Sequence, residues 1–280
     1  MSTFERVNCP DEASFHAVWQ RDKVSTLPAS ELAMTGGALA DRAAWVFIAG
    51  YQAALKQCFP ILSAHQGWCS YLVSEQRADP AVATCLATQT DAGVTLQGTK
   101  SWLASAKHLR WLIVKAKSAQ STHNLLVSVD DPGVTVDVRS GGRFLSEMTA
   151  GGASFDNTPV AAAHDLAARE HYADKFVFIE SRCLMVALCS HFARLATELG
   201  WDDGPLIQAR LIVAGLATAE LDQPESVRAL LAGMNQLRGW FDDWAARSPA
   251  SDLRDNWQAN QQLVDMHRRL LERALERRPQ

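Results

Sequence analysis

The sequence predicts an α+β fold with N-terminal helices, a central small antiparallel β-barrel and a C-terminal four-helix bundle. Apolar residues recur with a helical period of about 3.6 towards both ends of the chain, and with a period of two in the middle. The middle also contains closely spaced turn signals, such as Asp91-Ala92-Gly93 and Asp131-Pro132-Gly133. We therefore expect three domains, at residues 1–66, 67–165 and 166–280.

Two helices are expected in the first domain, over residues 10–22 and 37–57. The first helix places Phe15, Val18 and Trp19 on one side. The second is apolar almost all round, which is typical of a helix at the centre of a fold or in an interface.

Short strands are expected between about residues 70 and 160. Apolar residues such as Tyr71 and Val73, and later Val94 and Leu96, alternate with polar ones. Several short strands separated by turns are typical of a small antiparallel barrel or sandwich.

Four helices are expected in the last domain, over residues 174–199, 205–221, 224–247 and 251–278. Ser251 is the expected N-cap of the fourth helix. Short links between consecutive helices are typical of an antiparallel bundle. Four tryptophans are expected on the outside of the bundle as oligomer contacts: Trp201, Trp240, Trp244 and Trp257.

The composition argues against two classes of partner. The chain has 280 residues, of which 48% are hydrophobic, and a net charge of −4. Basic residues cluster only near the end of the chain, so we expect no nucleic-acid partner. The longest apolar run is interrupted by Glu180, Arg182 and His191, so we expect no membrane-spanning segment.

The cysteines and histidines do not have the spacing of metal ligands. The six cysteines form no Cys-x-x-Cys pair and have mostly apolar neighbours, which is typical of reduced, packed thiols. The eight histidines are scattered singly, without a His-x-x-x-His pair on one helix. We expect no metal site and a cytoplasmic location.

Four short motifs in the chain each resemble a motif of the same protein family. Residues 71–75 read Tyr-Leu-Val-Ser-Glu, and residues 98–105 read Gly-Thr-Lys-Ser-Trp-Leu-Ala-Ser. Residues 152–160 read Gly-Ala-Ser-Phe-Asp-Asn-Thr-Pro-Val, and residues 178–182 read Phe-Ile-Glu-Ser-Arg. Together with the order of helices, strands and bundle, these motifs make the chain resemble the acyl-CoA dehydrogenase flavoproteins, as a shortened and divergent member.

The resemblance implies an FAD cofactor between the β-domain and the bundle. The positions that match the family's flavin contacts are Tyr71, Val73, Ser74, Trp102, Ala104 and Ser105. The resemblance places Trp102 against the flavin ring, a stacking contact of about 1 kcal/mol. The alternative is that Trp102 only fills the core. Ala104 stands where the family has a hydroxyl, and Ser105 beside it is the expected substitute.

The resemblance leaves the catalytic base less well defined. The late stretch that carries the family's usual catalytic glutamate is not found in this sequence. Some relatives carry the base directly before the arginine of the first bundle helix, and this position is Ser181 here. Glu180 is the candidate base, although one residue turns a helix by about 100°; the alternative is a salt bridge or a solvated carboxylate. Arg182 is the candidate substrate contact, with a structural or phosphate-facing charge as the alternative.

Two functions follow from these matches and departures. The first is FAD-dependent oxidation of an acyl-CoA or a related thioester at a CH–CH bond. The alternative is a degenerate, non-catalytic relative that acts as a binding or assembly partner. The departures favour the alternative, since residues 77–80 read Arg-Ala-Asp-Pro where the family has a Gly-Ser-Asp loop. Either function is compatible with a homo-oligomer or a partner subunit.

Overall fold

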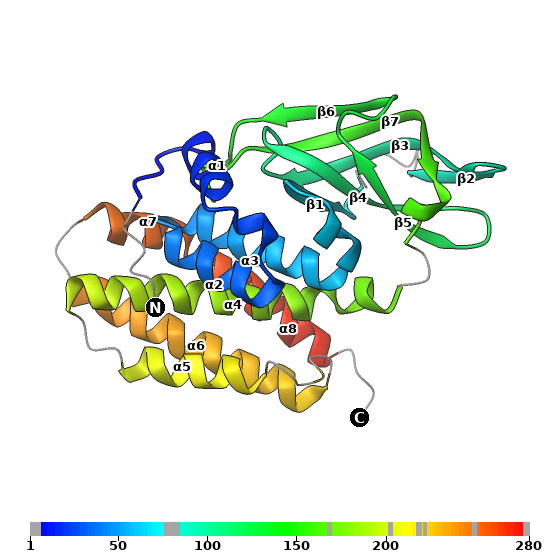
Figure 1. Cartoon of the computed structure of the whole chain (residues 1–280). Coiled ribbons are helices and arrows are strands. Elements are labelled where there is room, and N and C mark those ends of the chain that lie inside the picture. The colour runs from blue at the N-terminus through cyan, green and yellow to red at the C-terminus, as the bar shows by residue number, and fades with distance from the viewer. Residues whose placement is uncertain are drawn as a thin grey trace.

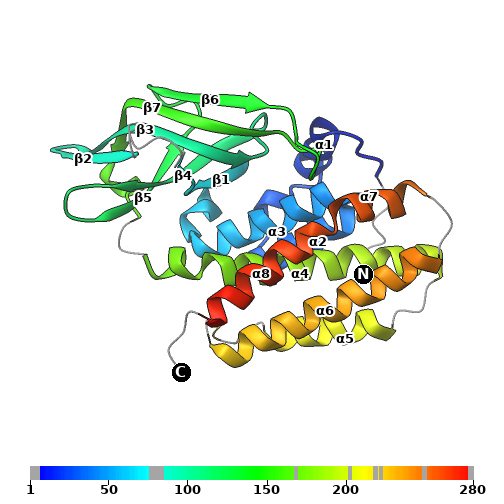
Figure 2. The same cartoon turned by 180° about the vertical axis from the view of Figure 1, so that it is seen from behind.

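The computed structural model describes residues 7–75, 85–166, 170–200, 204–216, 220, 223–247 and 251–276. A β-sheet forms one layer and the helices form the other, with the sheet over one end of the helical layer (Figures 1 and 2). The chain therefore has the α+β class that the sequence predicts.

From residue 7 onwards, where the description begins, the N-terminal part contains three helices and two short 3-10 turns. They are α1 (Glu12–Arg21), η1 (Val24–Thr26), α2 (Ala29–Leu39), α3 (Ala43–Cys58) and η2 (Pro60–Ala64). The first confirms the helix expected over residues 10–22. It begins after Asp11, whose carboxylate accepts a hydrogen bond from the backbone N–H of Ser14 at 2.8 Å.

The single helix expected over residues 37–57 is wrong, because the chain turns between α2 and α3. Ala40 and Arg42 have extended backbone conformations at this corner. The Asp41 carboxylate between them accepts a hydrogen bond from the Cys9 N–H at 2.9 Å and pairs with the Arg42 guanidinium at 2.9 Å. These polar contacts stabilise the corner in place of helical hydrogen bonds.

Seven strands of the described part of the chain form one sheet. They are β1 (Trp68–Leu72), β2 (Leu86–Thr90), β3 (Gly93–Ala104), β4 (Leu109–Lys117), β5 (Thr122–Ser128), β6 (Val134–Arg139) and β7 (Ala150–Ala161). Their order is β1-β4-β2-β3-β7-β6, and β5 pairs with β4. A short 3-10 turn, η3 (Ala162–His164), follows the last strand.

The prediction of a small antiparallel barrel is wrong in its strand directions. β1 pairs with β4 in parallel, so the sheet is mixed. All five residues of β1 are buried, which is typical of a parallel strand that is covered on both faces. Among the strands that the structure describes, β1 and β6 end the order and do not pair with each other, so these strands do not close into a barrel.

Within its described residues, the C-terminal part contains five helices where the sequence predicts four. They are α4 (Glu170–Leu199), α5 (Gly204–Gly215), α6 (Pro224–Arg247), α7 (Asp252–Asn260) and α8 (Gln262–Glu276). The expected fourth helix is interrupted at Gln261, beside Asn260. The Asn260 side chain bonds to the backbone of Leu145 and Asn256, which ties this break to a loop of the sheet.

α4 lies at the centre of the helical layer, where α2 and α3 pack directly on it (Figure 1). Glycines allow this close approach: a Cβ on Gly50 would lie 2.7 Å from the Cα of Leu184. By length and composition alone, Lys175–Glu198 is apolar enough to cross a membrane, and 67% of its most apolar window is buried inside the protein. Packing against α2 and α3 accounts for this burial.

The expected outer position of the bundle tryptophans is wrong for three of the four. Trp240 and Trp257 are buried, and Trp244 is partly buried. These indoles lie around Phe241, which is 4.3 Å from the Trp257 ring and 4.8 Å from the Trp244 ring between centroids. They fill the space between α4, α6 and α7. Trp201 lies outside the described residues.

Candidate functional site

The ends of β1 and β3 lie side by side and expose two apolar side chains. The Ser101 N–H donates a hydrogen bond of 3.0 Å to the carbonyl of Ser74. Val73 is 45% exposed and Trp102 is 41% exposed. The exposure of Trp102 excludes the alternative that it only fills the core. The two side chains leave an open apolar surface at the end of the sheet.

A bulge in β3 gives Trp102 this position. The register between β3 and β7 shifts between Lys100 and Leu103. Lys100 and Leu103 are buried, whereas Trp102 between them is exposed. Bulges of this kind change the direction of a side chain relative to regular alternation.

Lys100 is a site residue that the sequence reasoning did not single out. Its side chain is 1% exposed, and its Nζ lies 2.6 Å from a carboxylate oxygen of Glu75. The ion pair joins β3 to the segment that follows β1. Lys100 belongs to the Gly-Thr-Lys-Ser-Trp motif, and this position in the motif could have identified it as a site residue.

A buried hydrogen-bond network holds the two strand ends from beneath. The Tyr51 hydroxyl of α3 accepts a hydrogen bond from the Tyr71 N–H at 2.8 Å and lies 3.3 Å from the Ser70 hydroxyl. Ser70 in turn accepts a hydrogen bond from the Ala104 N–H at 3.2 Å. The Tyr71 hydroxyl donates to Asn124 at 3.0 Å. Tyr71 and Ala104 are therefore buried supports of the site.

Ser105 has an unusual backbone and an unused hydroxyl. Its φ is +55°, in the left-handed region that few non-glycine residues adopt. Its N–H donates to the Thr149 carbonyl at 2.8 Å, which holds the turn after β3. Ser105 is completely buried, and its Oγ has no hydrogen-bond partner among the residues that the structure describes.

Glu180 lies on the side of α4 that is close to α3. It is partly buried, and no hydrogen bond or ion pair is recorded for its carboxylate in the described part of the chain. Burial raises the pKa of this carboxyl to about 8. Burial raises the pKa values of Tyr51, Cys58 and Cys183, and the negative charge of Glu180 raises them further. Glu180 is therefore neither an ion-pair partner nor a fully solvated carboxylate.

The two residues after Glu180 have other partners. Ser181 is buried, and its hydroxyl donates to the Val177 carbonyl at 2.7 Å and lies 3.0 Å from His267 Nδ1 on α8. Arg182 donates to the Leu216 carbonyl at 3.0 Å and to Gln57 Oε1 at 2.7 Å. Through these contacts the Arg182 guanidinium links α4 to α3 and to the end of α5.

The structure thus brings together the residues that the sequence assigns to the cofactor. Val73, Ser74 and Trp102 are exposed at the strand ends, whereas Tyr71, Ala104 and Ser105 are buried beneath or beside them. Tyr51 connects the strand ends to Glu180 of α4, since its hydroxyl bonds to β1 and it is close enough to Glu180 to be affected by its charge. In the described residues, no group of three or more His, Cys, Asp or Glu could hold a metal ion.

Comparisons with known proteins agree on the fold. No protein-family model matches the sequence, and no curated protein matches it. Among solved structures, apo-form PigA has a TM-score of 0.65 at 14% identity, over 97% of this chain and 94% of that one. PigA with FAD and proline has a TM-score of 0.62 at 14% identity, over 90% and 82%.

Two further structures are similar over most of the chain. The ChsE4-ChsE5 complex from Mycobacterium tuberculosis has a TM-score of 0.59 at 13% identity, over 99% of this chain and 91% of that one. Glutaryl-CoA dehydrogenase from Mycobacterium smegmatis has a TM-score of 0.52 at 16% identity, over 92% and 89%. The chain therefore has the fold of acyl-CoA dehydrogenase-like proteins, as the motifs indicated.

Proposed function

We propose that the protein is a flavoprotein oxidoreductase that binds FAD at the ends of β1 and β3. The observation that carries the proposal is the open apolar surface of Val73 and Trp102 at these ends. Adjacent exposed apolar side chains mark a binding site more often than a single exposed residue does. The structure of PigA with FAD and proline, which has a similar fold, supports the same choice of cofactor.

The residues at the strand ends fit a flat, partly polar ring. Trp102 offers an aromatic face for stacking, and Val73 extends the apolar contact. Ser74 next to Val73 provides a hydroxyl that can donate or accept a hydrogen bond. The Lys100–Glu75 ion pair and the Tyr51 network hold these groups in place before any ligand arrives. FAD, when bound, supplies an acceptor for a hydride.

We propose Glu180 as the general base for such a reaction. With a pKa raised to about 8 by burial, Glu180 is a stronger base than an ordinary glutamate, but it must first lose its own proton, so activity that depends on it should rise with pH up to about 8. No ion pair competes for it in the described residues. It would take the α-proton of an acyl thioester, a substrate class consistent with the glutaryl-CoA dehydrogenase that shares this fold.

The first experiment is a visible absorption spectrum of the purified protein, before and after FAD addition and desalting. We expect a retained flavin band. The Trp102→Ala variant should weaken FAD binding about fivefold to tenfold, since a stacking contact contributes about 1 kcal/mol. The matched control is Trp111→Ala, because Trp111 lies on the same sheet and bonds to the Gln66 carbonyl instead.

Two results would count against a flavin site at the strand ends. One is a protein that retains no flavin at saturating FAD. The other is a Trp102→Ala variant that keeps its FAD affinity but loses as much stability as a core substitution. Turnover of acyl-CoA by the wild type, lost in Glu180→Gln with flavin retained, would support the assignment of the base.

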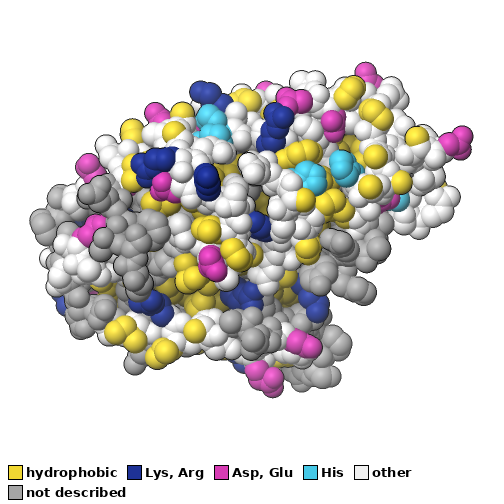
Figure 3. Space-filling model, viewed as in Figure 1, with side chains coloured by type: hydrophobic (Ala, Val, Ile, Leu, Met, Phe, Trp, Pro, Cys, Tyr) yellow, Lys and Arg dark blue, Asp and Glu magenta, His cyan; other side chains and the backbone are white. Residues whose placement is uncertain are grey.

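We also propose an assembly role through α5, with or without catalysis. Ile207 is 45% exposed and Leu211 is 67% exposed, and they are four residues apart on one face of this helix. Figure 3 shows hydrophobic side chains on the surface over α5. A partner surface that covers them would remove this apolar area from water. The similarity of the fold to that of the ChsE4-ChsE5 complex supports a partner subunit or a second copy.

A further inference from the structure

A second surface feature lies away from the strand ends, along α8. A groove of about 300 Å³ separates this helix from the loop between β6 and β7. Its volume is at the lower end of the range for small-ligand pockets. Figure 2 shows α8 on the near side of the molecule, below this loop. Its lining comprises Phe144, Gln262, Met266, Arg269, Leu270 and Arg273. We call it the α8 groove.

The lining of the α8 groove is ordered along the helix. Gln262 lies at the first turn, Met266 follows one turn later, Arg269 and Leu270 are adjacent in the next turn, and Arg273 lies in the last turn. From the first to the last of these residues the helix rises about 16 Å. The lining therefore combines apolar side chains with two arginines in the C-terminal half of the helix.

The two arginines have no anion of their own within the described residues. Neither Arg269 nor Arg273 forms a hydrogen bond or an ion pair within the described residues, whereas Arg268, the residue before Arg269, lies 3.7 Å from Asp265. The negative end of the helix dipole favours a cation in the last turn. Two like charges four residues apart nevertheless repel each other, so an anion between them would stabilise both.

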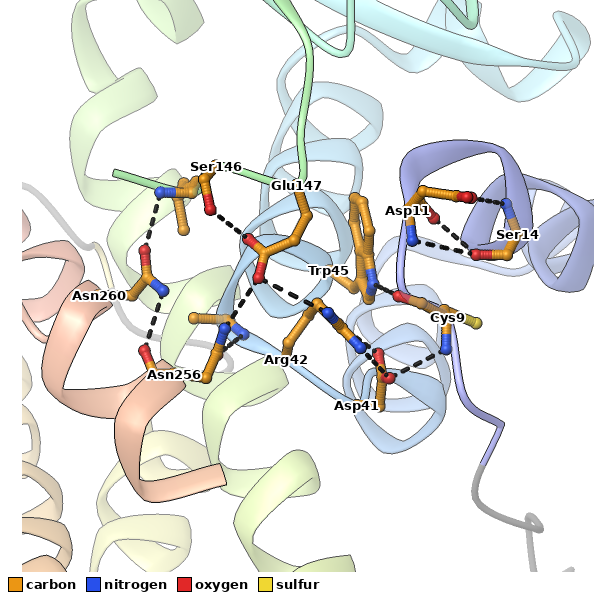
Figure 4. A network of polar contacts seen from close by, with 12 residues as sticks. Cys9, Asp11, Ser14, Asp41, Arg42, Trp45, Ser146, Glu147, Asn256 and Asn260 are labelled. Atoms are coloured by element: carbon orange, nitrogen blue, oxygen red, sulfur yellow. Dashed lines mark hydrogen bonds and ion pairs between the residues drawn. The ribbon is translucent and has the colours of Figure 1, made fainter. Parts of the chain in front are cut away.

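Phe144 is held in place from the opposite wall of the groove. The residue after it, Leu145, has a φ of +51° and is buried, and its N–H donates to Asn260 at 2.8 Å. A left-handed conformation at a buried leucine costs free energy that the surrounding contacts must offset. Figure 4 shows how Asn260 and Asn256 of α7 and Glu147 of the loop are joined by further polar contacts. The loop thus presents Phe144 to the groove in a defined position.

We propose that the α8 groove binds an organic anion with an extended apolar body. The apolar body lies on Phe144, Met266 and Leu270, and the carboxylate or phosphate group is held by Arg269 and Arg273. Guanidinium groups suit both anions, since each can donate two parallel hydrogen bonds. This site is separate from the proposed flavin site and does not depend on it.

The test is calorimetric titration of the full chain with octyl phosphate, octanoate and the neutral octanol. We expect the two anions to bind and octanol to bind at least tenfold more weakly. Tighter binding of octyl phosphate would identify a phosphate ester as the class, and tighter binding of octanoate a carboxylate. Equal affinity for octanol and for both anions would overturn the proposal.

Variants locate the binding on the protein. The double variant Arg269→Gln/Arg273→Gln should lower the affinity for octyl phosphate at least tenfold, and Phe144→Ala should lower the affinity for all three probes. Arg228→Gln is the matched control, because Arg228 is an exposed arginine on α6 outside the groove. An unchanged affinity in the double variant would overturn the assignment.

A final titration separates the α8 groove from the flavin site. With FAD added to saturation, octyl phosphate should bind with the same affinity as before. Loss of that binding on FAD addition would mean that the groove belongs to the flavin site, which contradicts a separate anion site. The proposed flavin site fails independently, if Trp102→Ala and the wild type bind FAD equally.

Discussion

At the scale of single residues, Glu180 shows how position on a helix decides chemistry. It follows Ile179, which is buried, and precedes Ser181, whose hydroxyl bonds within the helix and faces His267. The one-residue offset from the expected base position turns Glu180 towards Tyr51 of α3 instead of towards α8. The result is a carboxyl group with a raised pKa in a packed region.

The raised pKa predicts a pH-dependent stability that Glu180→Gln removes. The folded state holds the proton more tightly than the unfolded state, whose pKa is near 4.5. The stabilisation is therefore fully present below pH 4.5, is lost progressively as the pH rises, and is gone above about 8. The melting temperature of the variant should exceed that of the wild type by an amount that grows between pH 5 and 8.

The control for this prediction is Glu272→Gln, because Glu272 is an exposed glutamate on α8. Its melting temperature should follow that of the wild type at every pH. A Glu180→Gln variant whose difference from the wild type stays constant with pH would show that Glu180 has an ordinary pKa.

At the scale of elements, the glycines of α2 and α3 decide how closely these helices approach α4. A Cβ on Gly37 would overlap the backbone carbonyl of Ala187, and backbone cannot move away as a flexible side chain can. Gly239 of α6 is different, since nothing lies near the position of its missing Cβ. Both glycines lie within helices, so the two positions form a matched pair.

We expect Gly37→Ala and Gly239→Ala to change stability in opposite directions. Gly37→Ala should lower the free energy of unfolding by about 1–3 kcal/mol, because it overpacks the α2–α4 contact. Gly239→Ala should raise it by about 0.5–1 kcal/mol, because alanine is the better helix former. Urea denaturation measures both, and a neutral Gly37→Ala would mean that the helices lie farther apart than described.

At the scale of the whole molecule, one polar junction connects parts that are far apart in the sequence (Figure 4). The Asn256 side chain on α7 accepts from the Ala43 N–H at 3.0 Å and donates to Glu147 at 3.0 Å. Glu147 also lies 3.7 Å from Arg42. The junction joins the start of α3, the loop before β7 and the C-terminal helices.

Removing this junction should cost more than removing an exposed side chain nearby. Asn256→Ala should lower the free energy of unfolding by about 2 kcal/mol, because it leaves two partly buried partners without their hydrogen bonds. Gln258→Ala, at an exposed position two residues later, should stay within about 0.5 kcal/mol of the wild type. Equal effects of the two substitutions would show that the junction contributes little.

Assembly is also a property of the whole molecule. If α5 forms an interface, the double variant Ile207→Glu/Leu211→Glu should shift the protein towards the monomer in sedimentation velocity. The control is Met34→Glu, at an exposed residue of α2 that is 46% exposed. A wild type that is monomeric alone and that co-purifies with no other subunit would argue against this use of α5.

The sequence alone determined the α+β class, the helix that became α1, the bounds of α6 and the two motifs that lie at the strand ends. Each of these depends on residues close together in the chain: a capping residue, an apolar repeat or a motif of a few positions. Such local signals survive into the fold because the same short segment makes the interaction. For the same reason Trp102 could be selected before its exposure was known.

Only the tertiary structure decided the other features. The break between α2 and α3 depends on Cys9, and the break between α7 and α8 involves Leu145, so neither could be found in the helices' own periodicity. The parallel pairing of β1 with β4, the burial of Trp240 and Trp257, and the raised pKa of Glu180 likewise arise from segments far apart in sequence. The burial of a side chain and the pairing of a strand depend on which distant segments pack against it, and the apolar repeat of one segment does not specify those neighbours.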